Sequence, residues 1–311
     1  KSKGEKVFIA LDSDGFMMRD EVGGMPAYTI IKDELTKIIE GLGPTTLFNL
    51  AVFDHHSTTI LFPRMVPATR ENTSRVGKWL EPLNKVEAGM SDDAYGTKTL
   101  GSGGTASRED FAGGELHPVE WPNSARHWYS PSAMAMQQQA DAVFVLTGWW
   151  GVMRHAKSEW KVWPDAKRRR WEEHVRMGKQ MLADENKERR ANGEAPKVIR
   201  DHHMLIREYF PEKYETLRQP EPEWYRYTAR DFAKSLHLFR KEQTPRLPSK
   251  SGLTKKKKDT FSLNVIFFAR VDDLDAQAWE IEQFGEMASL CKGKFRSIAG
   301  LEAIKNSVSG R

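Results

Sequence analysis

Six short, mostly apolar runs constrain the fold of this chain more than any other feature of its sequence. Each ends at turn residues, and none approaches the roughly 20 apolar residues that a membrane-spanning helix needs. Runs of this kind are typical of strands that are buried on both faces of a parallel sheet. They cover residues 7–11, 45–53, 58–62, 142–146, 263–269 and 295–298.

Helical patterns separate these runs. Apolar side chains recur at helical spacing over residues 26–42, 69–86 and 276–291, and a shorter helix is expected from residue 131. Strands that alternate with helices imply an α/β fold with a doubly wound, mostly parallel, Rossmann-like sheet. Cys291 is the single cysteine, which excludes an internal disulfide, and its place on an apolar helix face predicts a buried thiol.

Charge is distributed unevenly along the chain. Residues 151–260 hold 28 basic and 17 acidic side chains, whereas the rest of the chain holds 20 basic and 26 acidic ones. Helices are expected there at 165–190 and 228–241, so we predict a basic helical insertion after the fourth strand. It separates a first part of the α/β domain, 1–150, from a last part, 261–311. The imbalance suggests an anionic partner or docking of the insertion onto the acidic remainder.

A resemblance to a known family begins at the end of the first strand, with Asp12-Ser13-Asp14-Gly15-Phe16. This motif is similar to the Asp-x-Ser-x-Ser motif of bacterial von Willebrand factor A-like domains. Further sequence segments that resemble the family, at 48–53, 67–72, 140–147 and 263–269, follow in the family's order. The resemblance therefore covers about residues 6–147 and 261–306. It implies a divergent member of the family and a location in the periplasm or anchored outside the cytoplasm. Because the chain starts with Lys rather than Met, we expect a trimmed or mature form, in which a preceding anchor would provide membrane contact.

The resemblance also implies a metal-ion-dependent adhesion site, with oxygen ligands from three loops that suit Mg²⁺. Asp12 matches the family's first carboxylate, and Asp14 replaces its first serine. Phe16 replaces the second serine and cannot bind a metal. The family's last acidic ligand falls at Gly148, so that carboxylate is missing as well.

The family's threonine ligand lies in an irregular stretch, residues 87–128, which we expect to form a long loop. Thr105 is the favoured match and Thr97 the alternative. We therefore predict a degenerate metal site and no cofactor, with Asp12 and Asp14 accepting hydrogen bonds from amides of the following helix or capping a turn. The alternative is a retained Mg²⁺ site in which Asp14 compensates for the missing ligands.

The predicted function is a non-enzymatic protein-protein interaction or adhesion module. Its partner, which the sequence does not identify, would contact loops 12–24, 89–107 and 149–155, with the insertion beside them. Large aromatic and arginine side chains dominate many interfaces. The residues expected to bind the partner are Phe16, Trp149, Trp150, Arg168, Arg169 and Arg170.

Two other functions remain open on the sequence. Asp54-His55-His56, together with Asp12 and Asp14, could form the two-metal site of a phosphoesterase-like enzyme. The basic insertion could instead bind nucleic acid or another polyanion. A second triplet, Asp201-His202-His203, is interpreted as a helix cap followed by surface or partly buried imidazoles.

Overall fold

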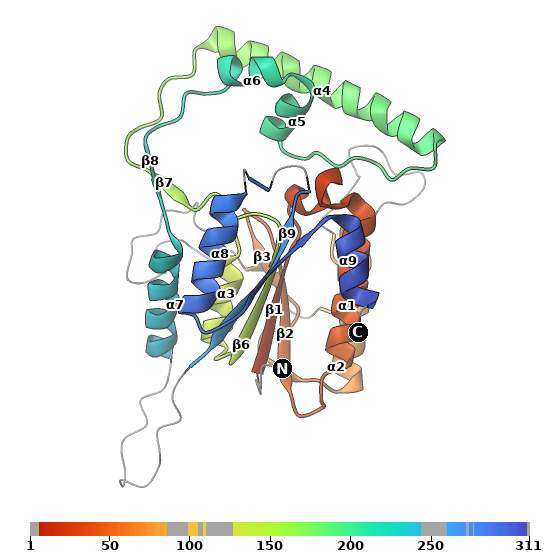
Figure 1. The fold of residues 1–311 in the computed structure, drawn as a ribbon, viewed down its shortest axis with the longest axis vertical. Coiled ribbons are helices and arrows are strands. Elements are labelled where there is room, and N and C mark those ends of the chain that lie inside the picture. The colour runs from red at the N-terminus through yellow and green to blue at the C-terminus, as the bar shows by residue number, and fades with distance from the viewer. Residues whose placement is uncertain are drawn as a thin grey trace.

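The computed structural model describes residues 6–85, 99–104, 108–109, 127–243, 260–271, 274–275 and 277–309. Its main body is a mixed, mostly parallel β-sheet between two layers of helices, and a further group of helices lies across one end of the sheet (Figure 1). Thr97 and Thr105, the two candidate threonine ligands, lie outside the described residues. None of the described helices is long and apolar enough to cross a membrane.

The principal strands of the sheet follow the order β10-β9-β6-β1-β2-β3, with β5 beyond β3 and β4 paired with β2. Four consecutive pairings, from β10 to β2, are parallel, while β3, β4 and β5 pair in antiparallel fashion. The strands are β1 Lys6–Asp12, β2 Leu47–Phe53, β3 Thr58–Ile60, β4 Val66–Pro67, β5 Arg108–Glu109, β6 Ala142–Thr147, β9 Ser262–Ala269 and β10 Phe295–Ala299.

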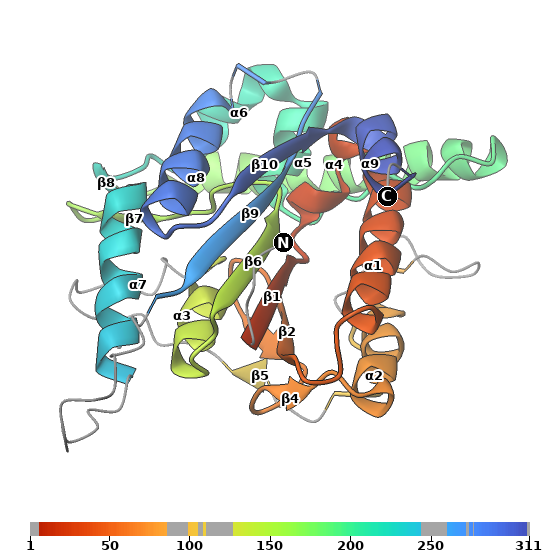
Figure 2. The same cartoon turned by 60° about the horizontal axis from the view of Figure 1, so that its bottom comes forward.

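Helices cover both faces of this sheet (Figure 2). One face is covered by α1 (Gly24–Glu40), α2 (Arg70–Leu80) and α9 (Gly300–Ser309). The other is covered by α3 (Tyr129–Gln137), α7 (Ala229–Gln243) and α8 (Ala278–Leu290). The predicted α/β class with alternating strands and helices is confirmed, and the order of the principal strands is compatible with a doubly wound, Rossmann-like sheet.

The central strands are apolar throughout because both of their faces are buried. In β1, Phe8 and Ala10 pack into the layer of α3, α7 and α8, while Ile9 and Leu11 pack into the layer of α1, α2 and α9. Side chains of a strand alternate between the two faces, so a strand between two helical layers needs apolar residues at every position. Cys291 is fully buried in the first of these cores, as predicted.

The helices that lie across the end of the sheet are α4 (Asp165–Ala191), α5 (His202–Tyr209) and α6 (Pro211–Leu217). They share a small apolar core of their own, and a two-stranded ribbon of β7 (Arg154–Ala156) and β8 (Trp224–Arg226) precedes and follows them. The long helix predicted at 165–190 is confirmed. The helix expected at 228–241 is present as α7, but it packs against α3 and α8 and shares their apolar core on one face of the sheet. The segment that leaves the main body is therefore shorter than 151–260.

Candidate functional site

The switch point of the sheet lies between β1 and β6. These neighbouring parallel strands end at Asp12 and Thr147, and the chain leaves them toward opposite sides of the sheet, to α1 and later to α7. Open α/β sheets place their ligands at such a point, beyond the carboxyl ends of the strands. Asp12 was predicted at this position from its motif.

Protein donors surround the Asp12 carboxylate. Its Oδ1 accepts the backbone N–H of Asp14 at 2.8 Å, as predicted, and its Oδ2 accepts the hydroxyl of Thr147 at 2.6 Å. Nε2 of His127 lies 3.3 Å from the same Oδ2. All three side chains are almost completely inaccessible to solvent. A metal ion bound through Oδ2 would have to displace the Thr147 hydroxyl and move the His127 ring.

Aromatic rings cover this centre. Phe16 stacks on Trp149 with ring centroids 4.3 Å apart, and Trp149 meets the ring of His127 edge-on at 5.0 Å. Both Phe16 and Trp149 are half-buried. Trp150 turns away from them into the core, where its ring lies 4.7 Å from that of Phe284. Of the predicted aromatic contacts, Phe16 and Trp149 therefore lie together near Asp12, while Trp150 is buried.

Gly148, where the family carries its last acidic ligand, is closely surrounded. A Cβ atom at this position would lie 3.1 Å from Sδ of Met17 and 3.4 Å from the backbone oxygen of Phe268. Met17 itself is fully buried in the helical turn that follows Asp14. An acidic side chain at this position would therefore force Met17 and its neighbours to shift.

Asp14 bonds across the carboxyl edge instead of capping the turn that follows it. Its Oδ2 lies 2.5 Å from Nδ1 of His55, which comes from the turn after β2. In the same turn, Asp54 accepts the backbone N–H groups of His56 and Ser57 and so acts as a cap.

The residues proposed for a two-metal enzyme are thus used in separate internal bonds. The described residues contain no group of three or more His, Cys, Asp or Glu side chains arranged to hold a metal ion. Asp201, by contrast, caps α5 as predicted, because its side chain accepts the backbone N–H of Met204.

Two arginines join the inserted helices to this edge of the sheet. Arg200 donates to the backbone oxygen of Ser13 at 3.4 Å and to Oδ1 of Asn84 at 2.5 Å. Arg189, in the last turn of α4, pairs with Asp20 at 2.5 Å. Burial lowers the pKa of Arg200, and the nearby Tyr28, Asp14 and Asp54 partly offset this shift. These contacts support docking of the basic segment onto the acidic remainder, one of the two expectations from the charge pattern.

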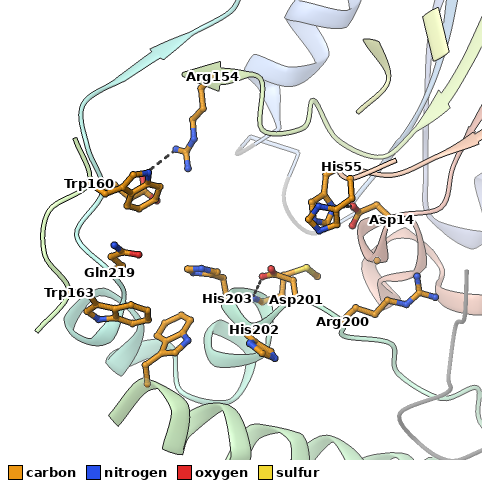
Figure 3. A pocket seen from close by; sticks show the side chains of 15 residues that line it. Asp14, His55, Arg154, Trp160, Trp163, Arg200, Asp201, His202, His203 and Gln219 are labelled. Carbon is orange, nitrogen blue, oxygen red and sulfur yellow. Dashed lines mark hydrogen bonds and ion pairs between the residues drawn. The ribbon is translucent and has the colours of Figure 1, made fainter. Parts of the chain in front are cut away.

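A cavity of about 530 Å³ lies between the carboxyl edge of the sheet and the inserted helices (Figure 3). Its lining combines imidazole, guanidinium, carboxylate and indole groups from both parts of the chain. Asp14, Gly15, His55 and His56 come from the sheet side. All the other lining residues come from the segment between β6 and α7: Arg154, Trp160, Trp163, Trp171, Arg200, Asp201, His202, His203, Met204, Gln219 and Glu221.

The predicted arginine run lies elsewhere. Arg168, Arg169 and Arg170 are exposed near the start of α4, and none of them lines this cavity. Arg168 pairs with Asp165 on the same helix at 2.9 Å, which is a weak exposed pair.

Sequence reasoning missed three contributors to this region. His127 and Arg200 lie in segments without a recognisable motif. Thr147 was noted only as part of the segment 140–147 that resembles the family, with no role at the site. No protein-family model matches the chain, and no similar sequence is found among curated proteins.

Proposed function

We propose that this chain is a divergent von Willebrand factor A-like domain that acts as a non-enzymatic, metal-independent protein-interaction module. The observation that carries the proposal is the environment of Asp12. The carboxylate that would be the first metal ligand is buried, bonded to Thr147 and to the Asp14 amide, and flanked by His127.

The remaining ligand positions also favour loss of the metal. A hard divalent cation such as Mg²⁺ needs several oxygen donors around an octahedron. Phe16 offers none, position 148 has no side chain, and Asp14 is engaged with His55. The residues present therefore do not fit a Mg²⁺ ion at this edge. The family assignment rests on the order of the sequence motifs, and a mostly parallel α/β sheet is compatible with it.

The proposed partner surface is the carboxyl edge of the sheet together with the inserted helices above it. Phe16 and Trp149 form a half-buried stacked pair there, and Trp160 is 50% exposed on the inserted side. Aromatic side chains in such partly covered positions are common anchors of protein interfaces. The extracytoplasmic location and the membrane anchor implied by the resemblance stay predictions, as does the binding role of Arg168 to Arg170.

Photo-crosslinking can test this function. A photoreactive residue at the exposed position His56, at the carboxyl edge, should form a discrete crosslink to a partner protein. The same residue at Glu40, exposed at the far end of α1, is the matched control and should form none. The yield at position 56 should be equal in excess Mg²⁺ and in a chelator, because no metal bridges the two proteins.

Three outcomes would refute the proposal. Crosslinking that disappears in the chelator would indicate a working metal site. Hydrolysis of phosphate esters by the protein in the presence of Mn²⁺ would favour the enzyme, and steeply salt-dependent binding of nucleic acid would favour a polyanion binder. Calorimetric titration with Mg²⁺ and Mn²⁺ should give no heat of binding at Asp12.

A further inference from the structure

The cavity between the sheet and the inserted helices has two chemically different sides. Trp160 and Trp163 lie on one side, together with Arg154 and Gln219 (Figure 3). His55, Asp14 and Arg200 lie on the other side. The start of α5 lies between them. Its volume, about 530 Å³, falls within the ~300–1,000 Å³ typical of small-molecule sites. The cavity therefore has the size of a ligand site and an uneven distribution of polar and apolar groups.

The acidic side chains of this cavity are already bonded within the protein. Asp14 is paired with His55, and Asp201 caps α5. Glu221 accepts Nε1 of Trp224 at 2.8 Å and lies 3.2 Å from Arg154. Each of these carboxylates is thus held by donors of the protein, and Glu221 is also paired with Arg218 at 3.0 Å.

Arg200 differs from these groups because its charge has no carboxylate bonded to it. Among the described residues, its two hydrogen bonds go to neutral oxygens, the backbone oxygen of Ser13 and the amide oxygen of Asn84. A guanidinium carries five N–H donors, so more donors are present than these two bonds use. Arg200 is partly buried, and the nearby carboxylates of Asp14 and Asp54 offset the cost of burying its charge only in part. A bound oxyanion would lower that cost further.

The opposite side offers flat apolar surfaces. The ring of Trp163 is fixed because its Nε1 donates to the backbone oxygen of Leu217 at 3.1 Å, and it packs edge-on against Trp171. Trp160 is 50% exposed and also packs edge-on, against Trp224. Indole faces held in this way are suited to stack on an aromatic group.

We infer that this cavity binds a small organic anion in which a carboxylate or phosphate is attached to an aromatic body. The oxyanion is bound beside Arg200, and the aromatic body lies against Trp160 and Trp163. This site goes beyond the proposed function, because it needs no partner protein. The ligand could be an aromatic carboxylic acid or an aromatic phosphate ester, because both would be recognised by the same side chains.

Binding of defined probes tests the inference. 1-Naphthoate and 1-naphthyl phosphate represent the two sources, and 1-naphthalenemethanol is the neutral aromatic control. Calorimetry should show saturable binding of at least one anionic probe and much weaker binding of the alcohol. The probe that binds more tightly shows whether the site prefers a carboxylate or a phosphate ester. If neither anion binds, or if the alcohol binds equally well, the inference is wrong.

Variants locate the site. Arg200→Gln should lower the affinity for the anionic probe about tenfold or more, since the substitution removes a charged hydrogen-bond donor. Arg176→Gln is the matched control, an exposed arginine of α4 outside the cavity, and should leave affinity unchanged. Equal losses in both variants would show non-specific attraction and overturn the inference.

Trp160→Leu provides a second test that does not depend on Arg200, whose bonds also join the inserted helices to the sheet. Since Trp160 is half exposed, this variant should fold normally and bind the naphthyl probes several-fold more weakly. Unchanged affinity in this variant would overturn the inference even if Arg200→Gln fails to fold. Crosslinking at position 56 remains a separate result, so failure of the ligand site and failure of the interaction function are distinguishable.

Discussion

Replacing Thr147 by valine probes the centre of the candidate site. Valine has nearly the same shape as threonine but lacks the hydroxyl that donates to Oδ2 of Asp12 at 2.6 Å. Both residues are completely buried, so water has no direct access to take the place of the lost donor. The substitution therefore leaves a buried carboxylate oxygen with one donor fewer while the packing of the strand end is kept.

The magnitude follows from the charge of the acceptor. A hydrogen bond to a charged group contributes about 1.5–3 kcal/mol to stability. When the donor is removed, the buried acceptor is left unsatisfied, which adds to the loss. We expect Thr147→Val to lower the free energy of unfolding by about 2 kcal/mol, which is roughly a factor of 30 in the folding equilibrium. Addition of Mg²⁺ should restore none of this loss, because no metal replaces the hydroxyl.

Urea unfolding followed by tryptophan fluorescence measures this loss. Thr147→Ser is the control, since serine keeps the hydroxyl and removes one buried methyl group, at a cost of about 1 kcal/mol. If serine destabilises the protein as much as valine does, the methyl group and not the hydroxyl matters. If Mg²⁺ stabilises the valine variant, Asp12 belongs to a metal site and the argument for a metal-independent domain fails.

Three further predictions test other parts of the structure. Burial raises the pKa of Glu280 above its ordinary value of 4.5, so the stability of the protein should fall as pH rises from 4.5 through the raised pKa. Glu280→Gln can still accept the backbone N–H of Trp150, and it should remove this fall when urea midpoints are measured against pH. An unchanged dependence of the midpoint on pH would contradict the prediction. Burial raises the pKa of the Cys291 thiol to about 12, so a thiol reagent at neutral pH should label the protein only on unfolding, and rapid labelling of the native protein would argue against this packing. Trp171→Ala should lower the stability of the core formed by the inserted helices by about 3–5 kcal/mol. Amide hydrogen exchange should become faster in α5 and α6 but not in α1. Equal acceleration in all three helices would show that this core does not unfold separately.

Much of the secondary structure could be predicted from the sequence because burial on both sides of a strand leaves a local pattern. The runs at 7–11 and 142–146 correspond to β1 and β6, and the helix expected at 165–190 is α4. The ribbon of β7 and β8 was not predicted, since its two strands have three residues each and lie about 70 residues apart. Strands that short carry too few side chains to show a period.

The extent of the insertion was harder to predict than its helices. The sequence pattern of α7 is that of an amphipathic helix, and nothing in it says which surface the apolar side covers. The structure packs Phe232 and Leu236 into the sheet's core beside α3 and α8, whereas α4, α5 and α6 share a core of their own. Local periodicity predicts that a helix has a buried face, but only the tertiary structure decides what that face contacts.

The sequence by itself determined the strand-helix alternation, the buried Cys291 and the position of Asp12 at the end of the first strand. It also showed that Phe16 and Gly148 cannot supply the ligands expected from the family resemblance. Only the tertiary structure decided that Thr147 and His127, more than 110 residues away along the chain, meet the Asp12 carboxylate, and that Arg200 reaches the loop after β1. The physical reason is that periodicity records the burial of each residue separately, whereas a hydrogen bond between distant residues depends on how all the strands and loops pack together.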